Sequence, residues 1–174
     1  MSLYNVAAAA ERITITLQRH GVAIEARKAS ASSSQYLRAG GLYIRLAAHV
    51  RHADAAATRG GVHMDLGPHV SGARFHPARA AAQILTRLGI APDEKLSAIL
   101  AGLDARERES VETLAAARAA LAEAGSTSER DLFMTWAGER YTATCPLGKN
   151  ARLNARRKLR LEFAAACQAE AGDR

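Results

Sequence analysis

The chain has 174 residues, 48% of them hydrophobic but only 5% aromatic, and its formal net charge is +7 at pH 7. This length suits one domain, with or without a helical appendage, and excludes two large independent domains. No apolar run approaches the roughly 18 residues that a membrane-spanning helix needs, and the first residues lack the basic region of a secretion signal, so we expect a cytoplasmic protein that does not contact a membrane.

Residues 1–89 are predicted to form a domain of the α-β-β-β-α type. Apolar side chains recur at helical spacing near the start, and apolar and polar residues then alternate in short strand-like segments. Ala39-Gly40-Gly41 lies between two of these segments and is a strong hairpin signal. The expected elements are a helix at 3–19, strands at 22–27, 35–38, 42–46 and 62–66, a flexible loop at 47–61, and a helix at 78–88.

Residues 90–125 are predicted to be a helical segment in two parts. Gly102 is expected to end a short helix at 92–101. Asp104 and Glu107 then resemble a capping box that opens a second helix, reaching about residue 124.

Residues 126–174 are predicted to form a β-hairpin followed by a basic helix. Strands are expected at 132–136 and 140–145, around Ala137-Gly138-Glu139, and the last helix at 151–170. The predicted fold class is therefore α+β, with a small antiparallel sheet packed on helices, a helical middle segment and a C-terminal β-hairpin plus helix. We expect these parts to pack as one globular unit.

The positive charge is unevenly distributed along the chain. Residues 22–87 contain nine Lys/Arg and three Asp/Glu, residues 88–131 contain five and nine, and residues 132–174 contain eight and four. Two basic regions therefore flank an acidic one. Polyanions favour Lys and Arg through phosphate contacts and counterion release, so the segregation indicates nucleic acid as a partner, although GC-rich coding produces a similar composition.

The sequence shows no sign of a disulfide or a cofactor. Cys145 and Cys167 have no CxxC partner, which is typical of reduced thiols that pack as small hydrophobic residues. Glycine motifs that cradle phosphates and nucleophile elbows are both absent from the sequence. We therefore predict a protein without a cofactor.

Short motifs within residues 9–88 resemble the small α-β-β-β-α domain of HicA-type RNA-cleaving toxins. They are Gly21-Val22, Arg27-Lys28, Ser32-Ser33-Ser34-Gln35-Tyr36, and a His49 that follows Ile44-Arg45-Leu46. That family's fold is similar to double-stranded RNA-binding domains, and the same motifs look like those of uncharacterised small proteins from phages and integrative elements. The resemblance implies a nucleic-acid-binding protein of phage or mobile-element type.

Ser33 stands where the toxin family has its catalytic histidine. A serine hydroxyl cannot shuttle protons near neutral pH as an imidazole does. The resemblance therefore implies an inherited binding surface without RNA cleavage.

The histidines suggest an alternative chemistry. Imidazole and carboxylate groups suit zinc or a similar ion, and a ribonuclease or metal-dependent nuclease would use His49 with His52 or His63. Their spacing matches no recognised metal motif. We predict no bound metal and interpret the histidines as surface residues, with the enzyme kept as an alternative.

One predicted nucleic-acid contact is the polar face of strand 42–46. The apolar residues of this strand share one face, which leaves Tyr43 and Arg45 on the other, with Arg38 across the hairpin. An aromatic ring beside guanidinium groups can stack on a base while the cations hold phosphates.

The other predicted contact is the basic helix. Arg152, Arg156 and Arg160 recur every four residues and so share one helix face, and Arg157 lies beside them. The alternatives are ion pairs with acidic residues of the 104–124 helix, or an inert solvated face.

The leading hypothesis for the whole protein is a non-catalytic, backbone-directed nucleic-acid-binding protein. One alternative is the enzyme described above, and the other is a protein-interaction module such as a counter-defence inhibitor.

Overall fold

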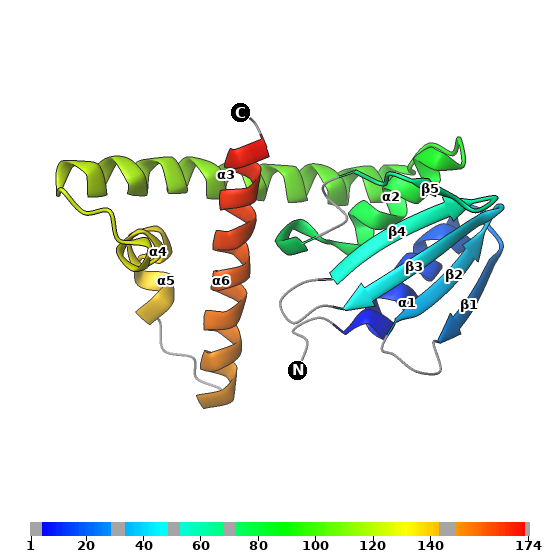
Figure 1. The fold of residues 1–174 in the computed structure, drawn as a ribbon, viewed down its shortest axis with the longest axis horizontal. Helices are drawn as coiled ribbons and strands as arrows, with labels where there is room; N and C mark the ends of the chain where they lie inside the picture. Colours follow the sequence, from blue (N-terminus) through cyan, green and yellow to red (C-terminus); the bar gives the residue numbers. More distant parts are fainter. Residues whose placement is uncertain (1–4, 29–33, 49–52, 68–71, 143–148, 173–174) are drawn as a thin grey trace. The chain divides into compact units, whose positions relative to one another are not determined.

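The chain folds into two compact units, Met1–Gly102 and Leu103–Arg174. The structure, a computed structural model, describes residues 5–28, 34–48, 53–67, 72–142 and 149–172. An antiparallel sheet with helices makes up the first unit, and the described part of the second is helical (Figure 1). The α+β class is confirmed. None of the helices in the described ranges combines the length and apolar character of a membrane-spanning segment.

The first unit consists of a helix, a five-stranded sheet and further helices. The strands are antiparallel and are paired in their chain order, so the sheet is a simple meander. In sequence the elements are α1 (Val6–Arg19), β1 (Ile24–Lys28), β2 (Gln35–Ala39), β3 (Leu42–Ala48), β4 (Ala53–Arg59), β5 (Val62–Met64), η2 (Gly72–Arg74) and α2 (Pro77–Arg87).

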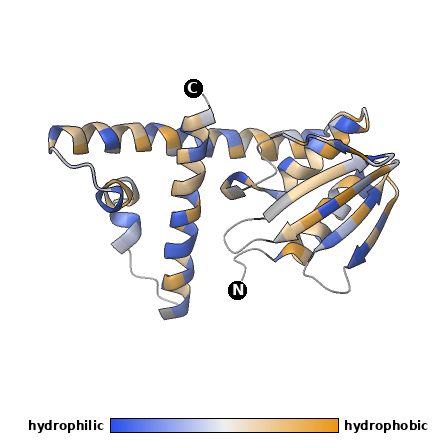
Figure 2. Cartoon of the chain, in the orientation of Figure 1, coloured by the Kyte–Doolittle hydropathy of each residue, from blue (hydrophilic) through white to orange (hydrophobic). Residues whose placement is uncertain are grey.

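One face of the sheet and the two helices α1 and α2 enclose an aliphatic core. Hydrophilic and hydrophobic residues alternate along β2 and most of β3 (Figure 2), and the inward residues Leu37 and Ile44 are completely buried. They pack in one cluster with residues such as Ile13 of α1 and Ile84 of α2, and both helices lie on the same side of the sheet (Figure 1). The opposite face of the sheet is therefore left without a helical cover from this unit.

The β2–β3 hairpin was predicted from its glycines and is confirmed. Gly40 and Gly41 have φ values of 51° and 81°. Residues other than glycine rarely adopt such positive φ values, and a two-residue hairpin turn of type I′ requires them at both positions. At Gly40 a Cβ atom would also lie 2.7 Å from Leu88 Cδ2. This turn therefore needs glycine for its backbone conformation, and a side chain at residue 40 would also require Leu88 to shift.

The expected flexible loop at 47–61 was wrong over the residues described. Residues 53–59 form β4, which pairs with β3 from Tyr43↔Thr58 to Ala48↔Ala53. Alanine has low strand propensity, so the sequence of β4 carries little local signal. Ala55 and Ala57 are nevertheless buried against the core, because strand formation depends on the neighbouring strand and the packed face.

Gly102 does not end a helix. Helix α3 runs without a break from Glu94 to Glu123, so Asp104 is an interior residue and opens no second helix. A glycine inside a helix costs only about 1 kcal/mol relative to alanine, and the leucines, alanines and charged residues on both sides favour the helix.

The predicted C-terminal hairpin was wrong. Residues 132–136 lie within α4 (Glu129–Ala137), and α5 (Glu139–Thr142) follows, before α6 (Lys149–Gly172); residues 143–145 lie outside the described ranges. The hydroxyl of Ser128 accepts from the Asp131 N–H at 3.3 Å and starts α4. Leu132, Phe133 and Trp136 are buried with Ala137 at helical spacing, so amphipathic packing outweighs their strand propensity.

A polar contact joins the C-terminal end of α1 to the start of α3. Asp93 accepts two hydrogen bonds from Arg19, at 2.7 and 3.0 Å, and one from the Leu96 N–H at 2.7 Å. The buried His20 ring accepts from the Asp93 N–H through Nε2 and meets the Thr16 carbonyl through Nδ1. Because a carbonyl only accepts, the Nδ1 atom carries the proton in this contact.

Replacing Asp93 with asparagine should weaken this contact in a pH-dependent way. The Leu96 N–H, and then the Arg19 guanidinium, hold the pKa of the Asp93 carboxyl below its usual range. The ionised form therefore favours folding, and its contribution is complete above about pH 4 and is lost as the pH falls through the lowered pKa. We expect Asp93→Asn to lower the urea midpoint of unfolding at neutral pH. The difference in midpoint between the variant and wild type should disappear under acid conditions.

Glu11→Gln removes an exposed carboxylate from α1 and is the matched control. It should leave the urea midpoint nearly unchanged at both pH values. If the difference in urea midpoint between wild type and Asp93→Asn stays the same under acid conditions, the negative charge of Asp93 does not have the stabilising role assigned to it.

Candidate nucleic-acid interface

The uncovered face of the sheet presents two adjacent rows of side chains. Because successive residues of a strand point to opposite faces, the register that buries Leu37 and Ile44 turns their neighbours outward. The first row is Arg27, Tyr36 and Arg45, and the second is Glu25, Arg38, Tyr43 and Thr58, each residue directly opposite the next. We call these seven residues the open sheet face.

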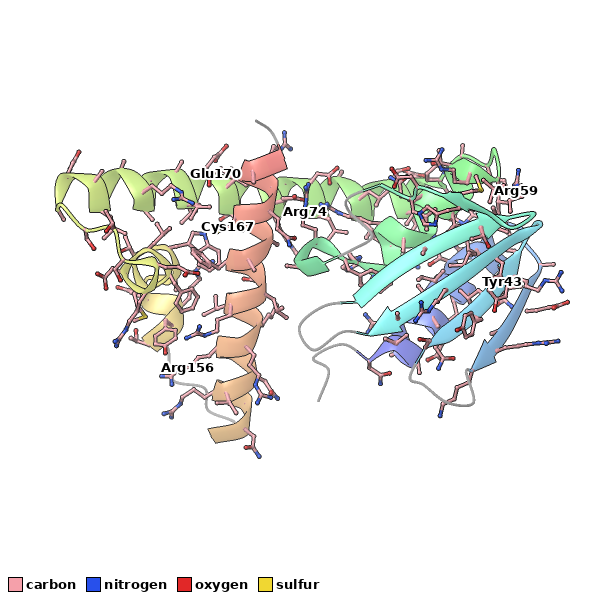
Figure 3. All side chains as sticks on the ribbon, in the orientation of Figure 1. Tyr43, Arg59, Arg74, Arg156, Cys167 and Glu170 are labelled. Carbon is pink, nitrogen blue, oxygen red and sulfur yellow. The ribbon has the colours of Figure 1, made fainter. Side chains whose placement is uncertain are left out.

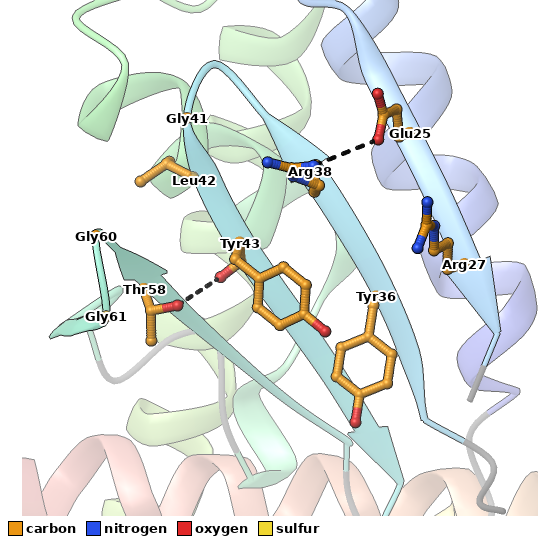
Figure 4. A pocket seen from close by; sticks show the side chains of 10 residues that line it. All are labelled: Glu25, Arg27, Tyr36, Arg38, Gly41, Leu42, Tyr43, Thr58, Gly60 and Gly61. Carbon is orange, nitrogen blue, oxygen red and sulfur yellow. Dashed lines mark hydrogen bonds and ion pairs between the residues drawn. The ribbon is translucent and has the colours of Figure 1, made fainter. Parts of the chain in front are cut away.

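Two tyrosines stack on each other at the centre of the open sheet face. The ring centroids of Tyr36 and Tyr43 are 5.4 Å apart and the ring planes differ by 25°. Tyr43 is 46% exposed although it is a large aromatic residue. Each ring contacts the other through one of its two faces, and the rings project from neighbouring strands (Figure 4). The arrangement offers an exposed aromatic surface on which a flat ligand can stack.

The charge of the open sheet face is mostly positive. Arg27, Arg38 and Arg45 surround the tyrosines, and Glu25 is the acidic member. Arg38 Nη1 is 3.9 Å from Glu25 Oε2, and both side chains are about two-thirds exposed, at 69% and 67%. Within the described residues neither Arg27 nor Arg45 has an ion pair. These two guanidinium groups are therefore available to bind an anion.

A hollow of about 350 Å³ lies over the second row of the open sheet face. Its floor includes Tyr43, and Thr58 Oγ1 donates to the Tyr43 carbonyl at 3.5 Å. Two glycine turns, at 40–41 and 60–61, border it, and at Gly41, Gly60 and Gly61 no atom lies within 4 Å of where a Cβ would be. A ligand in the hollow can approach the backbone at these turns.

The predicted sheet residues Arg38, Tyr43 and Arg45 lie together on this face, as their strand spacing indicated. Tyr36 and Arg27 belong to the same surface, and sequence reasoning did not assign them to it. The same two-residue period along 24–28 and 35–39 was the signal that would have found them.

The predicted histidines are not brought together in the described residues. His63 is exposed on β5, opposite Thr58, while His49 and His52 lie outside the described ranges. No three His, Cys, Asp or Glu side chains in the described part of the chain form a group that could hold a metal ion.

The second unit is built around an aromatic cluster. Phe133 of α4 contacts Trp136, Tyr141 and Phe163, with ring centroids 6.4, 5.6 and 5.4 Å away. Trp136 is almost completely buried, and its ring N–H donates to the Ser110 carbonyl of α3 at 3.1 Å. These rings connect α3, α4, α5 and α6 in one core.

Three arginines lie on the rings of this cluster. The guanidinium carbon of Arg140 is 4.6 Å from the Trp136 ring centroid, that of Arg156 is 4.6 Å from Tyr141, and that of Arg160 is 4.9 Å from Phe133. Arg156 also donates to the Tyr141 carbonyl at 3.4 Å; Figure 3 labels Arg156. Two of the predicted contact residues therefore take part in packing within the second unit.

The other predicted arginines of α6 are exposed. Among the described residues, Arg152 and Arg157 have neither a hydrogen bond nor an ion pair. The alternative for the basic face, ion pairs with acidic residues of the 104–124 helix, is not seen for Arg152 and Arg157: the α3–α6 ion pair that the described residues show is Arg118–Glu170, at 3.1 Å, with its arginine on α3.

Comparison of the chain with family models, with curated proteins and with solved structures finds no match.

Arg156→Ala should destabilise the second unit by about 1 kcal/mol, because it removes a cation–π contact and a hydrogen bond to the Tyr141 carbonyl. Arg152→Ala removes the same charge from the same helix without such contacts and should change stability by less than about 0.5 kcal/mol. Trp136, the single tryptophan, reports unfolding of this core by fluorescence. Equal urea midpoints for the two variants would show that the contacts of Arg156 contribute no stability.

Proposed function

We propose that the protein binds single-stranded nucleic acid through the open sheet face and does so without chemical turnover. The observation that carries the proposal is the stacked pair of the half-buried Tyr36 and the exposed Tyr43, flanked by arginines, on a sheet face that its own unit leaves uncovered. That the protein is of phage or mobile-element type follows from the sequence resemblance and is part of the same proposal.

The chemistry of this face suits a flexible strand. In a duplex the base faces are stacked within the helix, whereas an unpaired base can lie on an aromatic ring. Arg27 and Arg45 are the neighbours of Tyr36 in its row, so a strand whose base stacks on the tyrosines has cations on both sides for its phosphates. Neither stacking nor contacts to phosphate require a particular base. Both therefore agree with backbone-directed binding.

Two alternative functions predict different results in turnover and binding assays. A ribonuclease or metal-dependent nuclease using His49, His52 or His63 would consume its substrate and lose that activity in His49→Ala. A counter-defence inhibitor or other protein-interaction module would form a complex with a protein and not with an oligonucleotide. Turnover assays and binding assays on the same preparation distinguish the three.

Tyr43→Ala should weaken binding to a fluorescein-labelled oligouridine by roughly five- to hundredfold, since one stacked base contributes about 1–3 kcal/mol. Fluorescence anisotropy at constant salt measures this. Tyr43→Phe keeps the ring and is the matched control; it should bind nearly as wild type does. Equal affinity of Tyr43→Ala and wild type would show that the strand does not stack on Tyr43 and would contradict the proposal.

Arg152 and Arg157 test whether the second unit adds phosphate contacts. Removing one arginine that binds a phosphate of a single strand lowers the slope of log affinity against log salt by about 0.7, so the double variant Arg152→Ala with Arg157→Ala should flatten the slope by somewhat over 1. These two residues are chosen because they make no described packing contact. An unchanged slope, with binding intact, would confine the footprint to the first unit.

A further inference from the structure

We propose that the open sheet face selects a guanine base. In this inference, which rests on the proposed function, the Glu25 carboxylate accepts hydrogen bonds from the guanine N1–H and N2 amino group while Arg38 donates to O6. The base itself stacks on Tyr43.

A carboxylate on this face needs an explanation of its own. Glu25 repels phosphates, so a surface that only held a nucleic-acid backbone would bind more tightly without it. Its ion pair with Arg38 is a weak reason for its presence, because both groups are about two-thirds exposed and exposed pairs contribute little to stability. The closest N–O distance between the two groups, 3.9 Å, is also too long for a hydrogen bond. Both groups therefore keep their hydrogen-bonding capacity for a ligand.

The position of Glu25 and Arg38 suits contact with the edge of a stacked base. Arg38 is directly opposite Tyr43, and Glu25 is directly opposite Arg38 on the next strand. All three line the hollow of about 350 Å³, and Figure 4 shows Arg38 between the other two. A base stacked on the Tyr43 ring can therefore point one edge towards the Arg38 guanidinium and the Glu25 carboxylate beyond it.

Guanine matches this order of groups best. Its Watson–Crick edge has one acceptor, O6, followed by two adjacent donors, N1–H and N2–H₂; a carboxylate has two oxygens that can accept from both donors, and arginine is a good donor to O6. Adenine and cytosine each offer a single amino group as donor on that edge, and uracil a single ring N–H. Each of these bases therefore leaves one Glu25 oxygen without a partner.

The test uses short fluorescein-labelled oligouridines with one central guanosine, inosine, adenosine or cytidine. Wild-type protein should bind the guanosine strand roughly five- to hundredfold more tightly than the adenosine and cytidine strands, the range that one base-specific pair of hydrogen bonds provides. Inosine lacks the N2 amino group and should lose most of this preference. DNA strands with the same bases should show the same order, because the contacts are to the base.

Glu25→Gln should bind all four strands with similar affinity, because the neutral amide offers one acceptor oxygen and no negative charge. Glu11→Gln removes a negative charge from α1 and should keep the preference for guanosine, which separates base selection from a general gain in positive charge. A preference for cytidine, no preference in the wild type, or a preference that survives in Glu25→Gln would overturn the proposal. Binding that does not depend on Tyr43 would overturn the proposed function itself.

Discussion

The pleat of the first unit's sheet is the constraint on which both its stability and its candidate site depend. Consecutive residues of a strand point to opposite faces, so the pairing that buries Leu37 and Ile44 also turns Tyr36 and Tyr43 outward. A slip of one residue would move the aliphatic side chains into water and the tyrosines and arginines into the core. Burial of one large aliphatic side chain contributes about 1.5–3 kcal/mol, so the core holds the outer residues in register.

In the second unit, aromatic rings accommodate part of a dense run of like charges on α6, and Lys158 of the same run pairs with Glu162 at 3.6 Å. Aromatic rings carry negative charge on their faces, and Arg156 and Arg160 lie on two such rings. The guanidinium carbons themselves lie over the rings, 4.6 Å from the Tyr141 centroid and 4.9 Å from the Phe133 centroid. Arg152 and Arg157 are exposed on the same helix, so α6 combines arginines that stabilise the unit with arginines that face solvent.

The open sheet face combines two kinds of interaction that respond differently to conditions. Contacts between arginine and phosphate weaken as salt rises, because counterions compete for both partners. Stacking on Tyr36 and Tyr43 and hydrogen bonds to a base edge depend far less on salt. A surface with both can bind a strand through its backbone and still distinguish one base, provided that an acceptor such as Glu25 lies within reach of the stacked base.

By itself, the sequence was enough to predict the elements whose residues carry a local signal. The Gly40–Gly41 hairpin and the α6 helix follow from turn chemistry and side-chain period, and the period also placed Arg38, Tyr43 and Arg45 on one face. Tertiary structure decided the rest. Strand β4 exists because β3 pairs with it, since alanine alone does not favour a strand. The segment 132–136 is helical because its aromatic residues pack into a cluster drawn from four helices. Arg156 and Arg160 lie on rings that are brought to them by α4 and α5, and no pattern within α6 carries that information, because such contacts are made between residues far apart in the chain.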